Sequence, residues 1–112
     1  MAGYIHIVGF KFREDISDAD RQDVIDSFLA LKHKCLRDGK EYILAIRHGF
    51  PQRTFPWHND VDAVFVVEFA SKEDCDYYHQ KDEAHAAFLP KAKAANSPTA
   101  PGLVVAFAPV NN

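Results

Sequence analysis

The chain has 112 residues, 47% of them hydrophobic, and its 13 basic and 16 acidic residues give a formal net charge of −3. This length predicts one domain over residues 1–112, and the apolar content argues against a disordered chain. No excess of basic residues exists to release counterions from a phosphate backbone, which argues against nucleic-acid binding. The two cysteines, Cys35 and Cys75, are too few for a disulfide framework or a four-ligand zinc site.

No stretch of the sequence approaches the roughly 20 apolar residues that are needed to cross a bilayer. The beginning of the chain has no basic region followed by an apolar stretch and a small-residue cleavage site. We therefore expect no membrane association and a cytoplasmic protein.

Alternating side chains predict a strand over residues 4–13, and both of its faces are largely apolar, as in a strand buried on both sides. Ser17, three positions before Asp20, forms an approximate capping box, and an apolar stripe with helical spacing follows it. Residues 37–39 (RDG) are expected to end this helix, because glycine suits the left-handed cap. A second strand is predicted over residues 41–49.

The second half of the chain begins with a loop over residues 50–60 and a third strand over residues 61–70. A helix over residues 72–80 follows, and a break near Lys81 and Asp82 separates it from a further helical piece over residues 82–94. A last apolar strand is predicted over residues 103–108. The order β-α-β-β-α-β is that of an α+β, ferredoxin-like protomer, in which the helices cover one face of a four-stranded sheet.

The other face of this sheet has no cover within the chain. From the alternation we expect this bare face to carry Tyr4, His6, Val8, Phe10, Phe65, Val67 and Phe69. Soluble monomers do not tolerate an exposed apolar patch of this size, and a second copy related by two-fold symmetry is the simplest cover. The sequence therefore predicts a homodimer.

Three side chains are candidates for acid–base chemistry. His6 lies within the first strand, where burial would keep its imidazole neutral. Taken alone, however, it is better explained as a core histidine bonded to a backbone carbonyl or a partner side chain. His85 shares a helix face with Phe88, and Tyr78 precedes it; a helix that simply packs its aromatic face on the sheet is the alternative. The sequence contains no nucleophile elbow, no metal-ligand spacing and no phosphate-binding loop, so neither metal nor cofactor is expected.

The sequence resembles the stress-responsive dimeric A/B barrel family, often called Dabb, and the likeness covers nearly the whole chain. It is carried by Tyr78 and by residues 6–12 (HIVGFKF), 66–74 (VVEFASKED) and 82–88 (DEAHAAF), while residues 35–43 (CLRDGKEYI) look like fungal members. This resemblance implies a ferredoxin-like protomer and a homodimeric β-barrel. The family includes plant cyclases that convert linear polyketides to aromatic acids, a plant hydroxynitrile lyase, and many members with no established activity.

The similarity to the cyclase branch implies catalytic roles for His6, Tyr78 and His85 around an apolar pocket. Tyr77 or His79 takes the place of Tyr78 in an alternative alignment, because this segment is one residue longer than in the cyclase. The loop after the second strand, Phe50 to Asn59, departs from the family pattern, as does Glu83, which stands where the family has proline.

The resulting hypothesis is a cofactor-free acid–base enzyme of small-molecule metabolism that resembles a cyclase or lyase. It would act on a small apolar or aromatic carbonyl substrate. A non-catalytic, stress-responsive dimeric protein that binds a ligand is the alternative. We expect one apolar cavity between the sheet and the helices. The predicted substrate-binding residues are Val8, Phe10, Val24, Phe28, Phe65, Val67 and Phe88.

Overall fold

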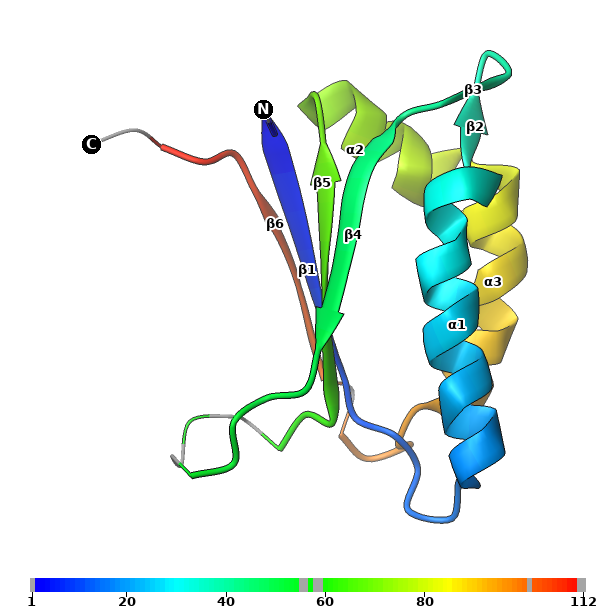
Figure 1. Ribbon diagram of the computed structural model, residues 1–112, viewed down its shortest axis with the longest axis vertical. Coiled ribbons are helices and arrows are strands. Elements are labelled where there is room, and N and C mark those ends of the chain that lie inside the picture. Colours follow the sequence, from blue (N-terminus) through cyan, green and yellow to red (C-terminus); the bar gives the residue numbers. More distant parts are fainter. Residues whose placement is uncertain (1, 55–56, 58–59, 101, 111–112) are drawn as a thin grey trace.

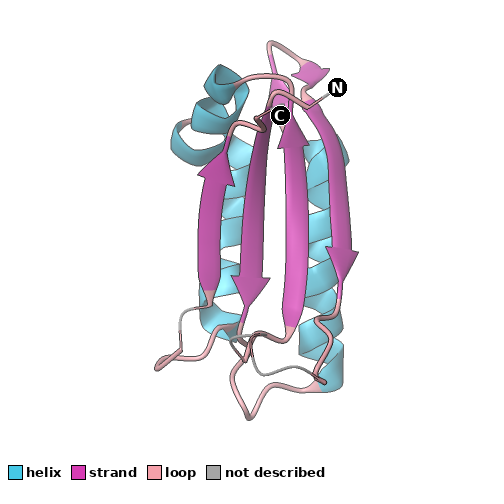
Figure 2. Cartoon of the chain, turned by 90° about the vertical axis from the view of Figure 1, so that its left-hand side faces the viewer, coloured by secondary structure: helices cyan, strands magenta, loops and turns pink. Residues whose placement is uncertain are grey.

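The computed structural model describes residues 2–54, 57, 60–100 and 102–110. A layer of helices packs on one face of an antiparallel sheet, and the other face of the sheet has no helix over it (Figures 1 and 2). The sheet has the strand order β4-β5-β1-β6. The elements are β1 (Tyr4–Phe10), α1 (Asp18–Lys34), β2 (Leu36–Arg37), β3 (Lys40–Glu41), β4 (Ile43–Gly49), β5 (Ala63–Phe69), α2 (Lys72–Gln80), α3 (Glu83–Ala95) and β6 (Leu103–Phe107).

The core lies between the sheet and the helices, and aromatic rings fill its centre. The rings of Phe28 on α1 and Phe65 on β5 stack with centroids 4.0 Å apart, and Phe10 on β1 meets Phe65 edge-on at 5.7 Å. Helix α1 begins at the predicted cap, because the Asp20 amide donates to Ser17 Oγ over 3.0 Å. The capping and the apolar stripe together hold α1 against the sheet.

The prediction of which sheet face is bare is wrong. Phe10 is 4% exposed, and Phe65, Val67 and Phe69 are completely buried, because the helices cover their face. His6 on the same face is 3% exposed. The uncovered face belongs to the alternate residues, which the strand registers place side by side: Ile5, Ile7, Val64, Val66, Leu103, Val105 and Phe107. It is also largely apolar, with one ion pair between Arg47 and Glu68 at 2.9 Å.

The sequence led us to expect that residues 37–39 end the first helix, and this prediction is wrong. Helix α1 ends at Lys34, and Asp38 and Gly39 form the turn of a short hairpin between β2 and β3. Both turn residues have positive φ, 54° and 75°. That conformation is favourable for an Asp-Gly hairpin turn, which explains why the same pair resembles a helix stop in the sequence.

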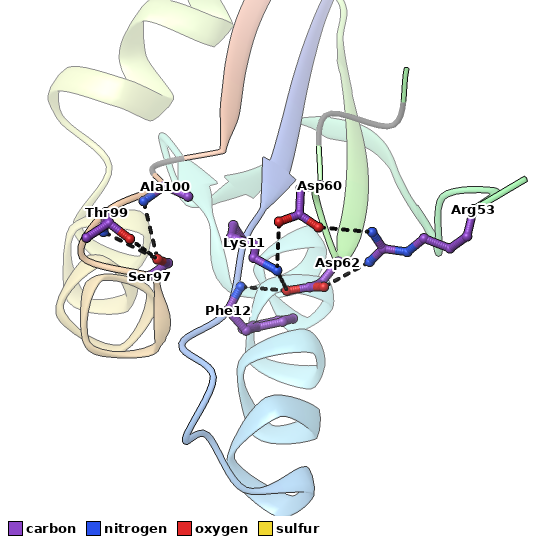
Figure 3. Close-up of polar contacts among 8 residues, drawn as sticks. All are labelled: Lys11, Phe12, Arg53, Asp60, Asp62, Ser97, Thr99 and Ala100. Atoms are coloured by element: carbon purple, nitrogen blue, oxygen red, sulfur yellow. Dashed lines mark hydrogen bonds and ion pairs between the residues drawn. The ribbon is translucent and has the colours of Figure 1, made fainter. Parts of the chain in front are cut away.

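Polar contacts hold the end of the sheet below β1 and β5 (Figure 3). The Asp62 carboxylate accepts hydrogen bonds from the Phe12 amide and from Arg53, each over 2.9 Å, and lies 3.6 Å from Lys11 Nζ. Nearby, Ser97 Oγ accepts hydrogen bonds from the amides of Thr99 and Ala100 in the connector before β6. A second carboxylate, Asp60, lies 3.4 Å from Lys11 Nζ and 3.6 Å from Arg53, so the two cations are matched by two carboxylates and we assign this cluster a structural role.

None of the helices in the described ranges has the length and apolar character that a membrane span requires.

Candidate functional site

Four ionisable rings meet between the sheet and the ends of two helices. His6 comes from β1, Tyr78 and His79 from α2, and His85 from α3. The Tyr78 and His85 rings stack with centroids 3.9 Å apart, and His79 meets His6 edge-on at 4.5 Å. The His79 and His85 centroids are 5.7 Å apart. All three predicted catalytic residues therefore lie in one cluster, together with His79.

The break between α2 and α3 brings these rings together. Lys81 leaves the helical conformation at φ −131°, and Asp82 caps α3 by accepting the His85 amide hydrogen bond at 3.0 Å. The predicted break is thus confirmed. His79 and His85 are six positions apart, a spacing that separates them on one continuous helix. The change of direction at Asp82 turns both toward the same space.

Asp82 is the buried support of this junction. Its side chain caps α3 through one carboxylate oxygen, and its other oxygen accepts the Tyr42 hydroxyl over 2.6 Å. Burial, followed by the hydrogen bond to Asp82, raises the pKa of Tyr42 above its ordinary value, so this phenol remains a donor. The first turn of α3, which carries His85, is thereby fixed to the segment that leads into β4.

We expect Asp82→Ala to destabilise the protein by about 2–4 kcal/mol. The change removes a helix cap, worth about 0.5–2 kcal/mol, and leaves the partly buried Tyr42 hydroxyl without its acceptor, at a cost of about 1–3 kcal/mol. Equilibrium unfolding in urea measures the effect. The control is Asp15→Ala, which removes an exposed carboxylate paired with Arg13. Equal stability of the two variants would contradict the role of Asp82.

Burial keeps the three predicted catalytic groups uncharged near neutral pH. It lowers the pKa of His6 to about 4, with the neighbouring His79 as the next cause. Burial and then His79 also lower the pKa of His85 below its ordinary 6.5. The pKa of Tyr78 is raised, again mainly by burial. The site therefore offers two neutral imidazoles and one neutral phenol.

These groups border a cavity of about 300 Å³ on the side of the core next to β6. Of the predicted substrate-binding residues, Val8, Phe10, Phe28 and Phe88 line it. Val24, Phe65 and Val67 do not line it. Phe65 and Val67 are completely buried in the core, and Val24, which is 3% exposed, borders a different pocket together with Ile16 and Ala95. The sequence pattern identifies all three as buried but cannot distinguish a packed position from a cavity wall.

Tyr77, Tyr78 and His79 are the alternatives for the catalytic residue of α2, and they lie in different surroundings. Tyr78 and His79 both line the cavity, whereas the Tyr77 hydroxyl donates to the Leu36 carbonyl over 3.2 Å, away from it.

Sequence reasoning missed the Asn96 amide, which also lines the cavity at the end of α3. Its Oδ1 atom is buried and has no hydrogen-bond partner among the described residues. No sequence pattern marks such an atom, since a C-terminal cap residue has many ordinary uses. Within the described part of the chain, no group of three or more histidine, cysteine or acidic residues is arranged to hold a metal ion.

The antiparallel order β4-β5-β1-β6 with helices on one face defines a ferredoxin-like α+β fold, as predicted. The chain belongs to the stress-responsive A/B barrel domain family, Dabb, whose family model matches residues 5–100. This confirms the family that the sequence resembles. No curated protein matches the chain.

Several solved structures share the fold. A protein from Arabidopsis thaliana is 19% identical, with a TM-score of 0.79 and coverage of 97% of each chain. A hydroxynitrile lyase from Passiflora edulis is 12% identical, with a TM-score of 0.79 and coverage of 97% of this chain and 94% of the other. A dimeric ferredoxin-like protein of unknown function from Thermobifida fusca is 17% identical, with a TM-score of 0.71 and coverage of 96% and 91%.

Proposed function

We propose that the protein is a cofactor-free acid–base enzyme of small-molecule metabolism that acts on an apolar carbonyl compound, as a cyclase or lyase does. The observation that carries this proposal is the stacked Tyr78–His85 pair at the wall of a cavity that is otherwise mostly apolar. A neutral imidazole accepts a proton, and a neutral phenol donates a hydrogen bond. Both are needed where a C–H bond next to a carbonyl ionises.

Each group has a distinct role in this proposal. His85 removes the acidic proton from the carbon beside the carbonyl, because its lowered pKa keeps it unprotonated at neutral pH. The Tyr78 hydroxyl donates to the carbonyl oxygen as negative charge builds on it, and burial makes that donor effective. His6 orients the substrate or carries the proton onward. Val8, Phe10, Phe28 and Phe88 supply the apolar contact surface.

The structural likeness to a protein named as a hydroxynitrile lyase supports a lyase-like reaction, since that protein shares the fold. It does not select the substrate. A polyketide or other secondary metabolite with a reactive carbonyl is the substrate class we favour, because the cavity is small and largely apolar.

Two probe reactions test the proposal. We expect the protein to accelerate hydrogen–deuterium exchange at the carbon between the two carbonyls of benzoylacetone, followed by NMR, or to cleave mandelonitrile, followed by release of benzaldehyde. His33→Gln is the control, because His33 is exposed on α1 and contacts Glu41 rather than the cavity. Saturable binding of both probes without acceleration of either reaction would favour the alternative, a stress-responsive protein that only binds ligands.

We also propose that the chain forms a homodimer through its bare sheet face and that it works in the cytoplasm. That face combines Ile5, Ile7, Val64 and Val66 with the half-exposed side chains of β6. An apolar surface that spans a whole sheet is seldom left open to water. The Thermobifida fusca neighbour is described as dimeric, which supports a dimer.

Val66→Asp is expected to convert the dimer to a monomer. Val66 pairs with Ile7 at the centre of the bare face. Its other cross-strand neighbour, Arg47, is already paired with Glu68 at 2.9 Å, so a carboxylate added here is buried against the partner without a cation of its own. Light scattering at micromolar concentration measures the mass. Leu36→Asp, in the small hairpin of β2 and β3, serves as the control and keeps the dimer mass. A wild-type protein that is monomeric and soluble would contradict the proposal.

A further inference from the structure

We propose that His79 carries a proton which it shares with His6 through an Nε2–H···Nε2 hydrogen bond, and that this histidine pair is the acid of the site. His85 remains the base. The location of the proton follows from the geometry alone, whereas its use in catalysis rests on the proposed function. His79 thereby becomes a further residue of the reaction.

The two rings are held so that their Nε2 atoms face each other. His6 Nδ1 lies 3.1 Å from the Val105 carbonyl, and His79 Nδ1 lies 3.0 Å from the Cys75 carbonyl. A carbonyl oxygen only accepts hydrogen bonds, and in His79 it lies closer to Nδ1 than the Cys75 thiol does, at 3.0 Å against 3.6 Å, so the geometry favours a hydrogen on each Nδ1. A neutral ring then has a bare Nε2, and these two atoms are 3.3 Å apart.

Two bare nitrogens at this distance repel each other, whereas one proton between them makes a charge-assisted hydrogen bond. The charge belongs on His79, because this side chain is exposed while His6 is buried. His79 therefore donates through both of its nitrogens, to the Cys75 carbonyl and to His6. His6 stays neutral, donates to Val105 and accepts from His79.

The surroundings of the pair agree with a single proton. Cys75 and Tyr78 face it from α2 and His85 faces it from α3, while β6 contributes the Val105 carbonyl. Burial raises the pKa of the Cys75 thiol to about 11, so this group adds no charge. No carboxylate lines the cavity among the described residues, and Asp82 is already bonded to Tyr42 and to the His85 amide.

With benzoylacetone, the C–H bond between the two carbonyls breaks, His85 takes that proton, and the bonding electrons move to the carbonyl oxygen. With mandelonitrile, His85 takes the hydroxyl proton, the carbonyl forms, and the bond to the nitrile carbon breaks so that cyanide leaves. The pair releases its proton to the oxygen or to the leaving group, so the substrate neither gains nor loses net charge. His85 is then cationic and the pair is neutral. One proton returns from His85 to His79 through solvent, which reaches the exposed His79 ring, and the cycle closes.

The proton can be located without any substrate. Long-range ¹H–¹⁵N NMR distinguishes protonated from bare ring nitrogens, and it follows each histidine as the pH is lowered. We expect the first proton taken up by the pair to appear on His79, and His6 to keep its hydrogen on Nδ1 and to remain neutral down to a pH of about 4. A His6 ring with its hydrogen on Nε2, or two rings that titrate independently of each other, would overturn the shared proton.

Two variants separate an acid role from mere positioning. His79→Gln keeps a neutral donor toward His6, and His79→Phe keeps only the ring shape. In His79→Phe the pKa of His6 should rise from about 4, because the charge beside it is gone, yet stay below 6.5 because burial persists. In the control variant His33→Gln, which changes an exposed residue of α1, the pKa of His6 should stay the same. An unchanged His6 pKa in His79→Phe would also contradict the pair.

Activity then tests the acid role. With benzoylacetone or mandelonitrile, the wild-type rate should fall at alkaline pH as the pair loses its proton. Both His79 variants should lose this alkaline fall and turn over about 10²-fold more slowly. Full rescue by His79→Gln would show positioning only and would overturn the acid role. A wild-type protein inactive on both probes would overturn the proposed function, while the NMR result would still decide where the proton lies.

Discussion

Replacing His85 with alanine is expected to lower turnover of the probe substrates by about 10²–10⁴-fold, the usual contribution of a general base. His85 lies at the cavity wall on Tyr78, and no other neutral imidazole on α3 can replace it. Initial rates measure the loss, and the dimer mass should not change. Full turnover in His85→Ala would contradict the role of His85 as the base, and the similarity to the family would then concern the fold alone.

The pH dependence of the reaction rate gives a second test of the role of His85. Burial and His79 lower the pKa of His85, so the neutral base accumulates as the pH rises through a value below 6.5. The acid side of the wild-type profile should therefore rise with pH and level off at a lower pH than a histidine of ordinary pKa would give. In Tyr78→Phe this limb should persist while the rate falls, because only a hydrogen-bond donor is lost. Such a donor is worth about 2.7–4 kcal/mol at a preorganised site.

Phe65→Ala is expected to destabilise the protein by about 3–5 kcal/mol, the range for buried phenylalanines. Phe65 is completely buried on β5, where it stacks on Phe28 and meets Phe10 and His48. No described side chain is free to fill the space that its ring leaves. Urea unfolding at a fixed protein concentration measures the change, since association would also contribute to stability.

The matched control for Phe65→Ala is Phe50→Ala. Phe50 follows β4, is 69% exposed and makes one edge contact with His48. A surface substitution of this kind changes stability by about 0.5 kcal/mol or less. Similar losses in the two variants would mean that the aromatic cluster around Phe65 does not anchor the core.

Most of the fold could be predicted because it depends on local patterns. The alternation in β1 and β5, the Ser17 cap and the Asp82 cap each fix an element through contacts between near neighbours in sequence. Which sheet face the helices cover is not a local property. Both faces of β1 are apolar, so alternation alone cannot choose between them. The Glu68 side chain on one face of β5 was the available signal, and it marks the face without helices.

The site was predicted in part for the same reason. His6, Tyr78 and His85 could be proposed one by one from burial, periodicity and resemblance, and the structure brings them together. The place of His79 in the site depends on two features of the helix junction. These are the break at Asp82 and the direction in which α3 then runs. The cavity walls depend on the packing of β6 and α3, which are joined through a connector with no regular spacing.

The junction between α2 and α3 also determines how the chemistry of this fold can diversify. Each residue of a helix turns the next side chain by about 100°. One residue added after Lys81, with the Asp82 cap retained, would leave His79 in place on α2 and change the direction in which α3 presents His85. The sheet and its bare face would be untouched. Length variation at one exposed turn is thus a means of changing which side chain of α3 reaches the cavity, and a set of variants with one or two residues inserted after Lys81 would sample it directly.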